Sequence, residues 1–214
     1  MPSPSDITEG LTYLANNWIA VAIVWHVFIA TLLVALLSGW QPARRALGLV
    51  LTLPLLSVSI VSGLAGNLFN AMFFAAGAIG LATIAARLST TPVERSSTLL
   101  ASIGLAMIAF GLLYPHFLGD GAAWRYLYAA PTGVVPCPTL AAAVGFTLWA
   151  DGLHSRSWTA VLAVMGVFYG LLGIFWLGVH LDLGLLIGSV ALATIAARHR
   201  ISSFRPGWAG TSGS

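Results

Sequence analysis

The stretch APTGVVPCPTLAAAVGFTLW, residues 130–149, places three prolines and the only cysteine of the chain ahead of an apolar run. Proline is tolerated in the first turn of a helix, where its missing N–H would have had no partner. We therefore predict that Pro136 and Pro138 mark the start of a helix and do not interrupt one. From Cys137 to Ala150 this helix would be about 21 Å long, at about 1.5 Å per residue.

The composition of the chain places this helix in a membrane. Hydrophobic residues make up 58% of the sequence and charged residues 7%, and the mean hydropathy is +0.93. Soluble domains carry about 25% charged residues, so we expect the surface of this chain to face a lipid bilayer. The net charge of +3 comes from scattered arginines, which is not the clustered pattern of basic residues that indicates nucleic-acid binding.

The predicted helix is too short to cross the membrane, so the segment before it must cover the remaining depth. A hydrocarbon core is about 30 Å thick, which a helix over residues 137–150 cannot span. Segment 129–136 must therefore dip below the membrane surface. Irregular backbone is tolerated there only when it is buried in protein or lines a wet cavity.

Measured against about 20 apolar residues per span, the sequence predicts an all-α membrane bundle of about seven transmembrane helices. The predicted spans are residues 18–38, 46–64, 67–86, 98–115, 134–150, 158–178 and 183–197. Residues 1–17 are predicted to lie in the membrane interface as a helix with Asp6 as N-cap and Glu9 three residues later. Residues 18–197 would form one helix-bundle domain, and residues 198–214 a cytoplasmic tail.

The arginines predict the orientation of the bundle. Seven spans place one arginine, Arg125, on one side of the membrane. The other eight share the opposite side: Arg44, Arg45, Arg87, Arg95, Arg156, Arg198, Arg200 and Arg205. Because cytoplasmic loops are enriched in arginine and lysine, we expect the N-terminus outside and the C-terminus in the cytoplasm.

An internal similarity suggests a repeated architecture. The sequence LATIAAR occurs at residues 81–87 and again at 192–198, an offset of 111 residues, which also aligns Gly77 with Gly188 and His26 with Cys137. Alanine-rich helix ends can converge by chance. A true repeat would give a 3+1+3 plan of two parallel three-helix bundles, a plan shared with sugar transporters of the SWEET class.

The broken start of the fifth span is the candidate site. The free N–H groups and the dipole of a helix start favour a thiolate at Cys137, although a small buried cysteine can also simply pack. His26, His116 and His180 are predicted on the same extracytoplasmic side. Thiolate and imidazole suit a transition-metal ion such as Cu(I) or Zn(II). No local spacing resembles a known metal motif, so such a site would have to be assembled from distant segments.

Two charged residues on that side have alternative interpretations. Asp182 precedes the apolar run of the seventh span and is typical of a helix N-cap. Arg125 could pair with Asp120 or Asp182, or interact with lipid headgroups.

The stretch YPHFLGDGAAWRYLYAAPTGVVPCPT resembles a family of uncharacterised bacterial membrane proteins, domain of unknown function 6064. The matching residues are Tyr114, Pro115, Gly119, Ala130, Pro131, Thr132, Gly133, Pro136, Cys137, Pro138 and Thr139, with an Asp-Leu-Gly-Leu at 182–185. Leu140 and Ala141 depart from the more polar and aromatic residues of the family pattern. The resemblance implies a multi-pass protein of the bacterial inner membrane and no settled activity.

Transport is the function that these features favour. The sequence has no Ser-His-Asp arrangement, no phosphate-cradling glycine loop and no carboxylate pair within a span, so we do not expect a soluble-type enzyme. The leading hypothesis is a small transporter or permease with its site at the broken start of the fifth helix. The alternative is a non-catalytic subunit or assembly partner of a larger membrane complex. The partners to consider are the lipid bilayer and either further copies of this chain or such a complex. A third hypothesis is a membrane oxidoreductase.

Overall fold

The computed structural model describes residues 3–118 and 123–202, with side chains described as far as residue 197. The helices are α1 (Pro4–Asn17), α2 (Ile19–Leu37), α3 (Arg44–Leu64), α4 (Leu68–Ala86), α5 (Thr98–Leu113), α6 (Tyr126–Ala129), α7 (Pro136–Trp149), α8 (Arg156–Leu171) and α9 (Asp182–Ser202). Three short helical turns join them: η1 (Ala123–Arg125), η2 (Asp151–His154) and the π-helix η3 (Leu172–Trp176). The tail at 203–214 and Asp120 lie outside the described residues.

Each of the seven apolar segments predicted from the sequence is a helix: α2, α3, α4, α5, α7, α8 and α9. Within the described ranges, four helices are long and apolar enough to cross a membrane: α2, α3, α4 and α8 extended through η3. The apolar helices Thr98–Leu113 and Asp182–Ala197 are shorter, and α7 has 14 residues. An all-helical fold with several membrane-length apolar helices is that of a membrane protein.

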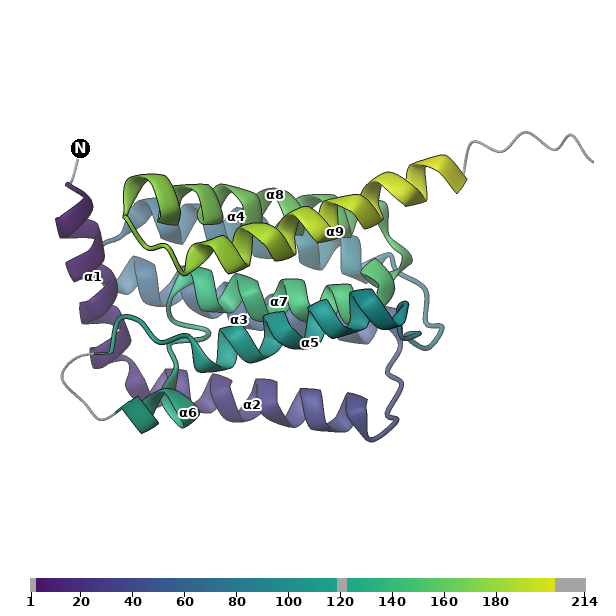
Figure 1. The fold of residues 1–214 in the computed structure, drawn as a ribbon, viewed down its shortest axis with the longest axis horizontal. Helices are drawn as coiled ribbons and strands as arrows, with labels where there is room; N and C mark the ends of the chain where they lie inside the picture. Colours follow the sequence, from purple (N-terminus) through teal and green to yellow (C-terminus); the bar gives the residue numbers. More distant parts are fainter. Residues whose placement is uncertain (1–2, 119–122, 203–214) are drawn as a thin grey trace, which may run out of the picture.

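Helix α1 crosses one end of the bundle, roughly at right angles to the long helices (Figure 1). It begins one turn earlier than the sequence predicts. Ser3 is the N-cap, and its capping box is completed by Asp6. The prediction of Asp6 as N-cap with Glu9 was wrong because Ser3 is also a strong capping residue and stands before Pro4, which suits a first helical turn.

Helix α7 is the core of the bundle. It packs against α3, α5, α8 and α9 (Figure 1), and every residue from 129 to 150 is buried. Small residues allow this close packing: a Cβ added to Gly104 of α5 would lie 2.6 Å from the carbonyl oxygen of Gly145 in α7. Lipid supplies no hydrophobic drive for helices to associate, so such backbone contacts dominate the packing.

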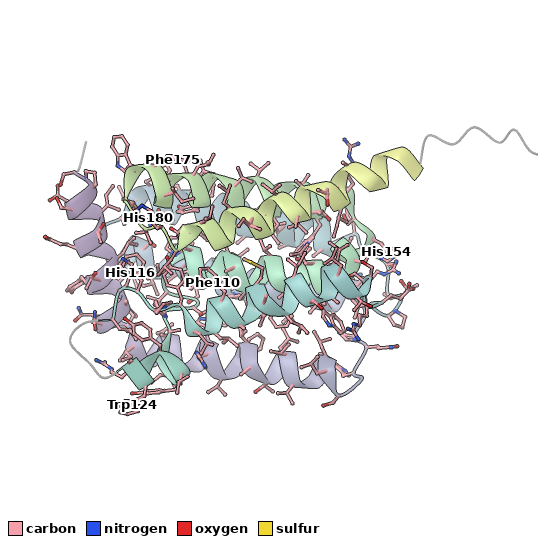
Figure 2. All side chains as sticks on the ribbon, viewed as in Figure 1. Phe110, His116, Trp124, His154, Phe175 and His180 are labelled. Atoms are coloured by element: carbon pink, nitrogen blue, oxygen red, sulfur yellow. The ribbon has the colours of Figure 1, made fainter. Side chains whose placement is uncertain are left out.

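The connections after α2 and α4 meet at one end of the bundle. Ala43 and Pro92 form an isolated β-bridge, and the N–H of Ser96 donates to the carbonyl of Trp149 at the end of α7 (2.9 Å). His154 lies at this end, whereas His116 and His180 lie at the end crossed by α1 (Figure 2).

Candidate functional site

The approach to α7 is an irregular segment whose polar backbone is satisfied inside the protein. The Thr139 hydroxyl accepts from the N–H of Gly133 (2.7 Å) and donates to the carbonyl of Val135 (2.7 Å). The Thr132 hydroxyl donates to the carbonyl of Gly111 in α5 (2.8 Å). The start of the helix at Pro136 and its buried, non-helical approach are therefore confirmed.

A buried polar cluster lies at this helix start. The carboxylate of Asp182 accepts two hydrogen bonds, from the Tyr114 hydroxyl at Oδ1 (2.7 Å) and from the Cys137 thiol at Oδ2 (3.1 Å). Asp182 is 1% exposed, Tyr114 0% and Cys137 4%. The three residues come from α9, the end of α5 and the first turn of α7, so the cluster ties together three helices distant in sequence.

This arrangement changes two interpretations of the sequence. Asp182 is the first residue of α9, and its carboxylate accepts from two other segments, so the N-cap interpretation was wrong. The Cys137 sulfur lies 3.1 Å from Oδ2 of Asp182, where a thiol can donate to the carboxylate, so this neighbour opposes the expected thiolate. The helix dipole favours negative charge at this sulfur, but an anion already occupies the position that the sulfur faces.

The π-helix η3 closes the cluster on another side. Its Gly173 is buried, and a Cβ added there would collide with the carboxylate of Asp182. Single π-helical turns within α-helices occur often at functional sites. Here the turn brings a residue without a side chain against a buried acid, which leaves no room for even one added carbon atom.

A second buried hydrogen-bonded pair joins α4 to α8. The Tyr169 hydroxyl donates to Oδ1 of Asn70 (2.8 Å). Sequence reasoning missed Tyr114 as a partner of the acid, as well as Tyr169 and Gly173. Tyrosine hydroxyls inside apolar spans are a signal that could have found the first two, because a buried hydroxyl requires a partner.

The predicted histidine ligands lie apart from this cluster. His26 is buried in α2, which packs against α6, and its Nδ1 has no hydrogen-bond partner among the described residues. His116 is half-buried, its ring 4.3 Å from that of Phe117, and burial lowers the pKa of its imidazole. His180 is exposed. Among the described residues, no group of three or more His, Cys, Asp or Glu side chains could hold a metal ion.

Arg125 is half-buried in η1. Its predicted partner Asp120 is outside the described residues, and within the described ones no ion pair joins Arg125 to Asp182. The buried acid is therefore held by uncharged donors.

Comparison with known proteins gives no relative: no protein-family model, no curated protein and no solved structure matches this chain.

Proposed function

We propose that this chain is a small transporter or permease of the bacterial inner membrane, with its site at the cluster of Tyr114, Cys137 and Asp182. The main observation in support of this proposal is that the Asp182 carboxylate is buried among apolar helices. An ionisable residue inside a membrane bundle is expensive, and it usually marks a path for a substrate or ion. The resemblance to the family of unknown function 6064 is part of this proposal.

The proposal includes seven spans, formed by α2, α3, α4, α5, α7, α8 with η3, and α9, and an extracytoplasmic N-terminus. The arginine-bearing segments support this orientation. The backbone of Arg44 and Arg45 bonds to residues 89–91, and α7 ends beside Ser96, at the end of the bundle where Arg156 begins α8. These arginines thus share one end, as cytoplasmic residues do. The cluster would then lie toward the extracytoplasmic side.

We expect opposite labelling of two single-cysteine variants in a Cys137→Ser background. Tyr13 is 60% exposed on α1, and the side chain of Glu94 is 71% exposed at the other end. A membrane-impermeant maleimide added to intact spheroplasts should label Tyr13→Cys and should label Glu94→Cys only after the membrane is disrupted. The reverse pattern, or labelling of both variants from outside, would contradict the orientation.

A 3+1+3 repeat is also part of the proposal. It would pair α2, α3 and α4 with α7, α8 and α9, leaving α5 as the linker. The close packing of α3 against α4 and of α8 against α9 supports it, because these two pairs occupy equivalent places in the two halves.

The broken helix and the π-turn support a transport site. Transporters often form their sites where a helix is discontinuous, because backbone groups and a helix end are then exposed to the substrate. In this chain the discontinuity at the start of α7 faces Asp182 and η3. The cluster is fully packed, so a substrate can enter it only if α9 or η3 moves relative to α7. A soft metal ion remains one candidate substrate, with Cys137 as a ligand.

A ligand screen tests the proposal with a matched pair of variants. Asp182→Asn removes the buried acid, and Asp151→Asn makes the same change at the opposite end, where Asp151 lies 3.6 Å from His154. The Tm of each purified protein would be measured in the presence of sugars, amino acids, organic anions, organic cations and transition-metal ions. A ligand at about 100 times its Kd adds about 2.7 kcal/mol of stability, which raises the Tm of a chain of this size by about 5–10 °C.

We expect at least one class of compound to stabilise the wild type and Asp151→Asn but not Asp182→Asn, and to accumulate in proteoliposomes. The proposal fails if no compound does so, or if the stabilising compounds act equally on Asp182→Asn. Elemental analysis of the purified protein separates a metal from the other classes.

A non-catalytic subunit is the second candidate. A groove of about 450 Å³ between α8 and α9 is lined by four alanines and by four larger apolar residues: Ala160, Ala163, Ala193, Ala196, Val164, Val167, Phe168 and Leu171. Small residues let another helix approach closely. Purification in a gentle detergent should recover a stoichiometric partner if this candidate is correct; recovery of this chain alone would oppose it.

A further inference from the structure

A pocket opens at the end of the bundle crossed by α1. It has a volume of about 570 Å³ and lies between α1, the turn that joins α3 to α4, and Leu172 at the start of η3. Small-molecule sites commonly measure about 300–1,000 Å³. The pocket is therefore large enough for a small ligand, and it lies outside the cluster of Tyr114, Cys137 and Asp182.

The charge at this pocket is negative. Asp6 of α1 lines it, and hydrogen bonds from the side chain and the backbone N–H of Ser3 lower the pKa of its carboxyl, so Asp6 is ionised at neutral pH. The described residues that line the pocket include no basic side chain. An anion would thus meet repulsion here, whereas a cation would find an unopposed carboxylate.

The rest of the lining is apolar with two amides. Phe69 and Leu172 supply apolar surface, and Asn67 and Asn70 supply the amides. Both amide oxygens are already used: Asn67 Oδ1 accepts from the N–H of Asn70 (3.1 Å), and Asn70 Oδ1 accepts from Tyr169 (2.8 Å). Each amide therefore has only its N–H₂ group left, which cannot bind an ammonium group but can donate to the phosphate of a lipid headgroup.

We infer that this pocket binds an ammonium group carried on a short apolar chain, with Asp6 as the countercharge. Two kinds of molecule carry such an ammonium group: a free alkylamine and the lipid phosphatidylethanolamine. The lipid is a candidate because α1 is predicted to lie in the membrane interface. Asn70 lines this pocket and also accepts from the hydroxyl of Tyr169 in α8. The ligand would therefore lie one hydrogen bond away from Tyr169.

Binding of a free amine would be tested with hexylammonium. The controls are 1-hexanol, which is neutral, and hexanoate, which is anionic, both with the same chain length. Binding to the full chain in mild detergent would be measured by isothermal titration calorimetry. We expect hexylammonium to bind the wild type about threefold more tightly than 1-hexanol, a modest factor because Asp6 is exposed and solvent screens its charge. Asp6→Asn should lose this preference, because the amide keeps the shape and the acceptor oxygen but not the charge.

Two further variants make the test specific. Glu9→Gln removes the same charge from the same helix at a residue that does not line the pocket, so it should bind hexylammonium like the wild type. Gly10 lines the pocket, and a Cβ added there meets no atom within 4 Å. Gly10→Phe should therefore fold normally and fill the pocket, reducing hexylammonium binding at least about tenfold.

The lipid arm uses the same variants reconstituted in vesicles of phosphatidylethanolamine and phosphatidylglycerol. Native mass spectrometry would then identify the lipid that each protein retains. If the headgroup is the source, the wild type and Glu9→Gln retain phosphatidylethanolamine, which hexylammonium displaces. If a free amine is the source, hexylammonium binds and neither lipid is retained. Equal binding of hexylammonium and 1-hexanol, or unchanged binding by Asp6→Asn or Gly10→Phe, overturns the inference whatever the outcome of the transport screen.

Discussion

Replacing Gly145 with valine is expected to prevent the chain from accumulating as a folded protein. A Cβ at this position would lie 2.6 Å from the carbonyl oxygen of Gly104 and 2.7 Å from the backbone nitrogen of Ile108. Both atoms belong to the backbone of α5, so no side-chain rotation relieves the overlap. Overpacking of a core usually costs about 1–3 kcal/mol and sometimes more, and here we expect at least about 3 kcal/mol.

The loss should be large because α7 has no alternative surface to occupy. All its residues are buried, and Gly111 repeats the same close contact seven residues along α5, where an added Cβ would lie 2.6 Å from the carbonyl oxygen of Pro138. Moving α5 outward at Gly145 would therefore open its contact with α7 along two further turns. A total stability of about 5–15 kcal/mol leaves little margin for that change.

Gly80→Val is the matched control for this prediction. Gly80 lies within α4, where an added Cβ would meet no atom within 4 Å, so its effect should stay within about 0.5 kcal/mol. Gel filtration in mild detergent and thermal unfolding followed by the fluorescence of the eight tryptophans measure both variants. Equal yields and equal Tm values for Gly145→Val and Gly80→Val would contradict the described contact of α5 with α7.

The positions of the helices could be predicted from the sequence because each depends on local information. A run of apolar residues of about membrane length predicts a helix wherever it occurs. The start of the short helix α7 was predicted as well, since proline is best tolerated in the first turn, although Pro54 lies inside α3. The turn before α4 contains Gly66, whose φ is +79°, and Asn67, whose side chain caps that helix; both residue types are common in turns.

The partners within the candidate site could not be predicted, because they depend on how distant helices pack. Cys137 and Asp182 are 45 residues apart, and Tyr114 and Asp182 are 68 residues apart. The sequence indicated only that Cys137, Asp182 and three histidines share one side of the membrane. Sharing a side does not bring residues together: His26 faces α6, His180 is exposed, and the closest partner of Cys137 is an acid that had been interpreted as a cap.

The π-helix is a second feature that no local pattern revealed. Residues 172–176, LGIFW, continue an apolar span and contain nothing that breaks a helix. The extra residue in the turn is explained only by what it faces, since it brings Gly173 against Asp182. A glycine inside an apolar run is thus ambiguous until the opposite helix is known: Gly166 and Gly170 pack on α9, as expected for close helix contacts, whereas Gly173 accommodates a buried acid.

Replacing Asp182 with alanine is expected to lower the free energy of unfolding by about 3 kcal/mol. The Tyr114 hydroxyl would lose its acceptor in a site closed to water, and a buried donor without a partner costs about 1–3 kcal/mol. The thiol of Cys137 is a weaker donor and adds less, and the space left by the carboxylate adds a cavity cost. For a chain of this size the total corresponds to a Tm lower by about 6–12 °C.

Asp182→Asn separates hydrogen bonding from charge in this prediction. Its amide oxygen can still accept from Tyr114, so we expect a loss of only about 1 kcal/mol. Thermal unfolding in mild detergent measures both variants under the same conditions. If alanine and asparagine were equally well tolerated, the carboxylate would not be holding the three helices together, although its part in transport could still be tested separately by the ligand screen.

A double-mutant cycle identifies the hydrogen bond itself. Tyr114→Phe removes only the hydroxyl that donates to Asp182 (2.7 Å), and Tyr13→Phe makes the same change at an exposed tyrosine of α1. Once Tyr114 is phenylalanine, Asp182→Ala no longer leaves a hydroxyl unpaired, so the double variant should be more stable than the sum of the single losses predicts by about 1–2 kcal/mol. Tyr13→Phe should show no such coupling, because its hydroxyl and Asp182 share no partner. Additive losses in the Tyr114 cycle would mean that the two side chains are independent, and the buried cluster would then lose the contact that joins α5 to α9.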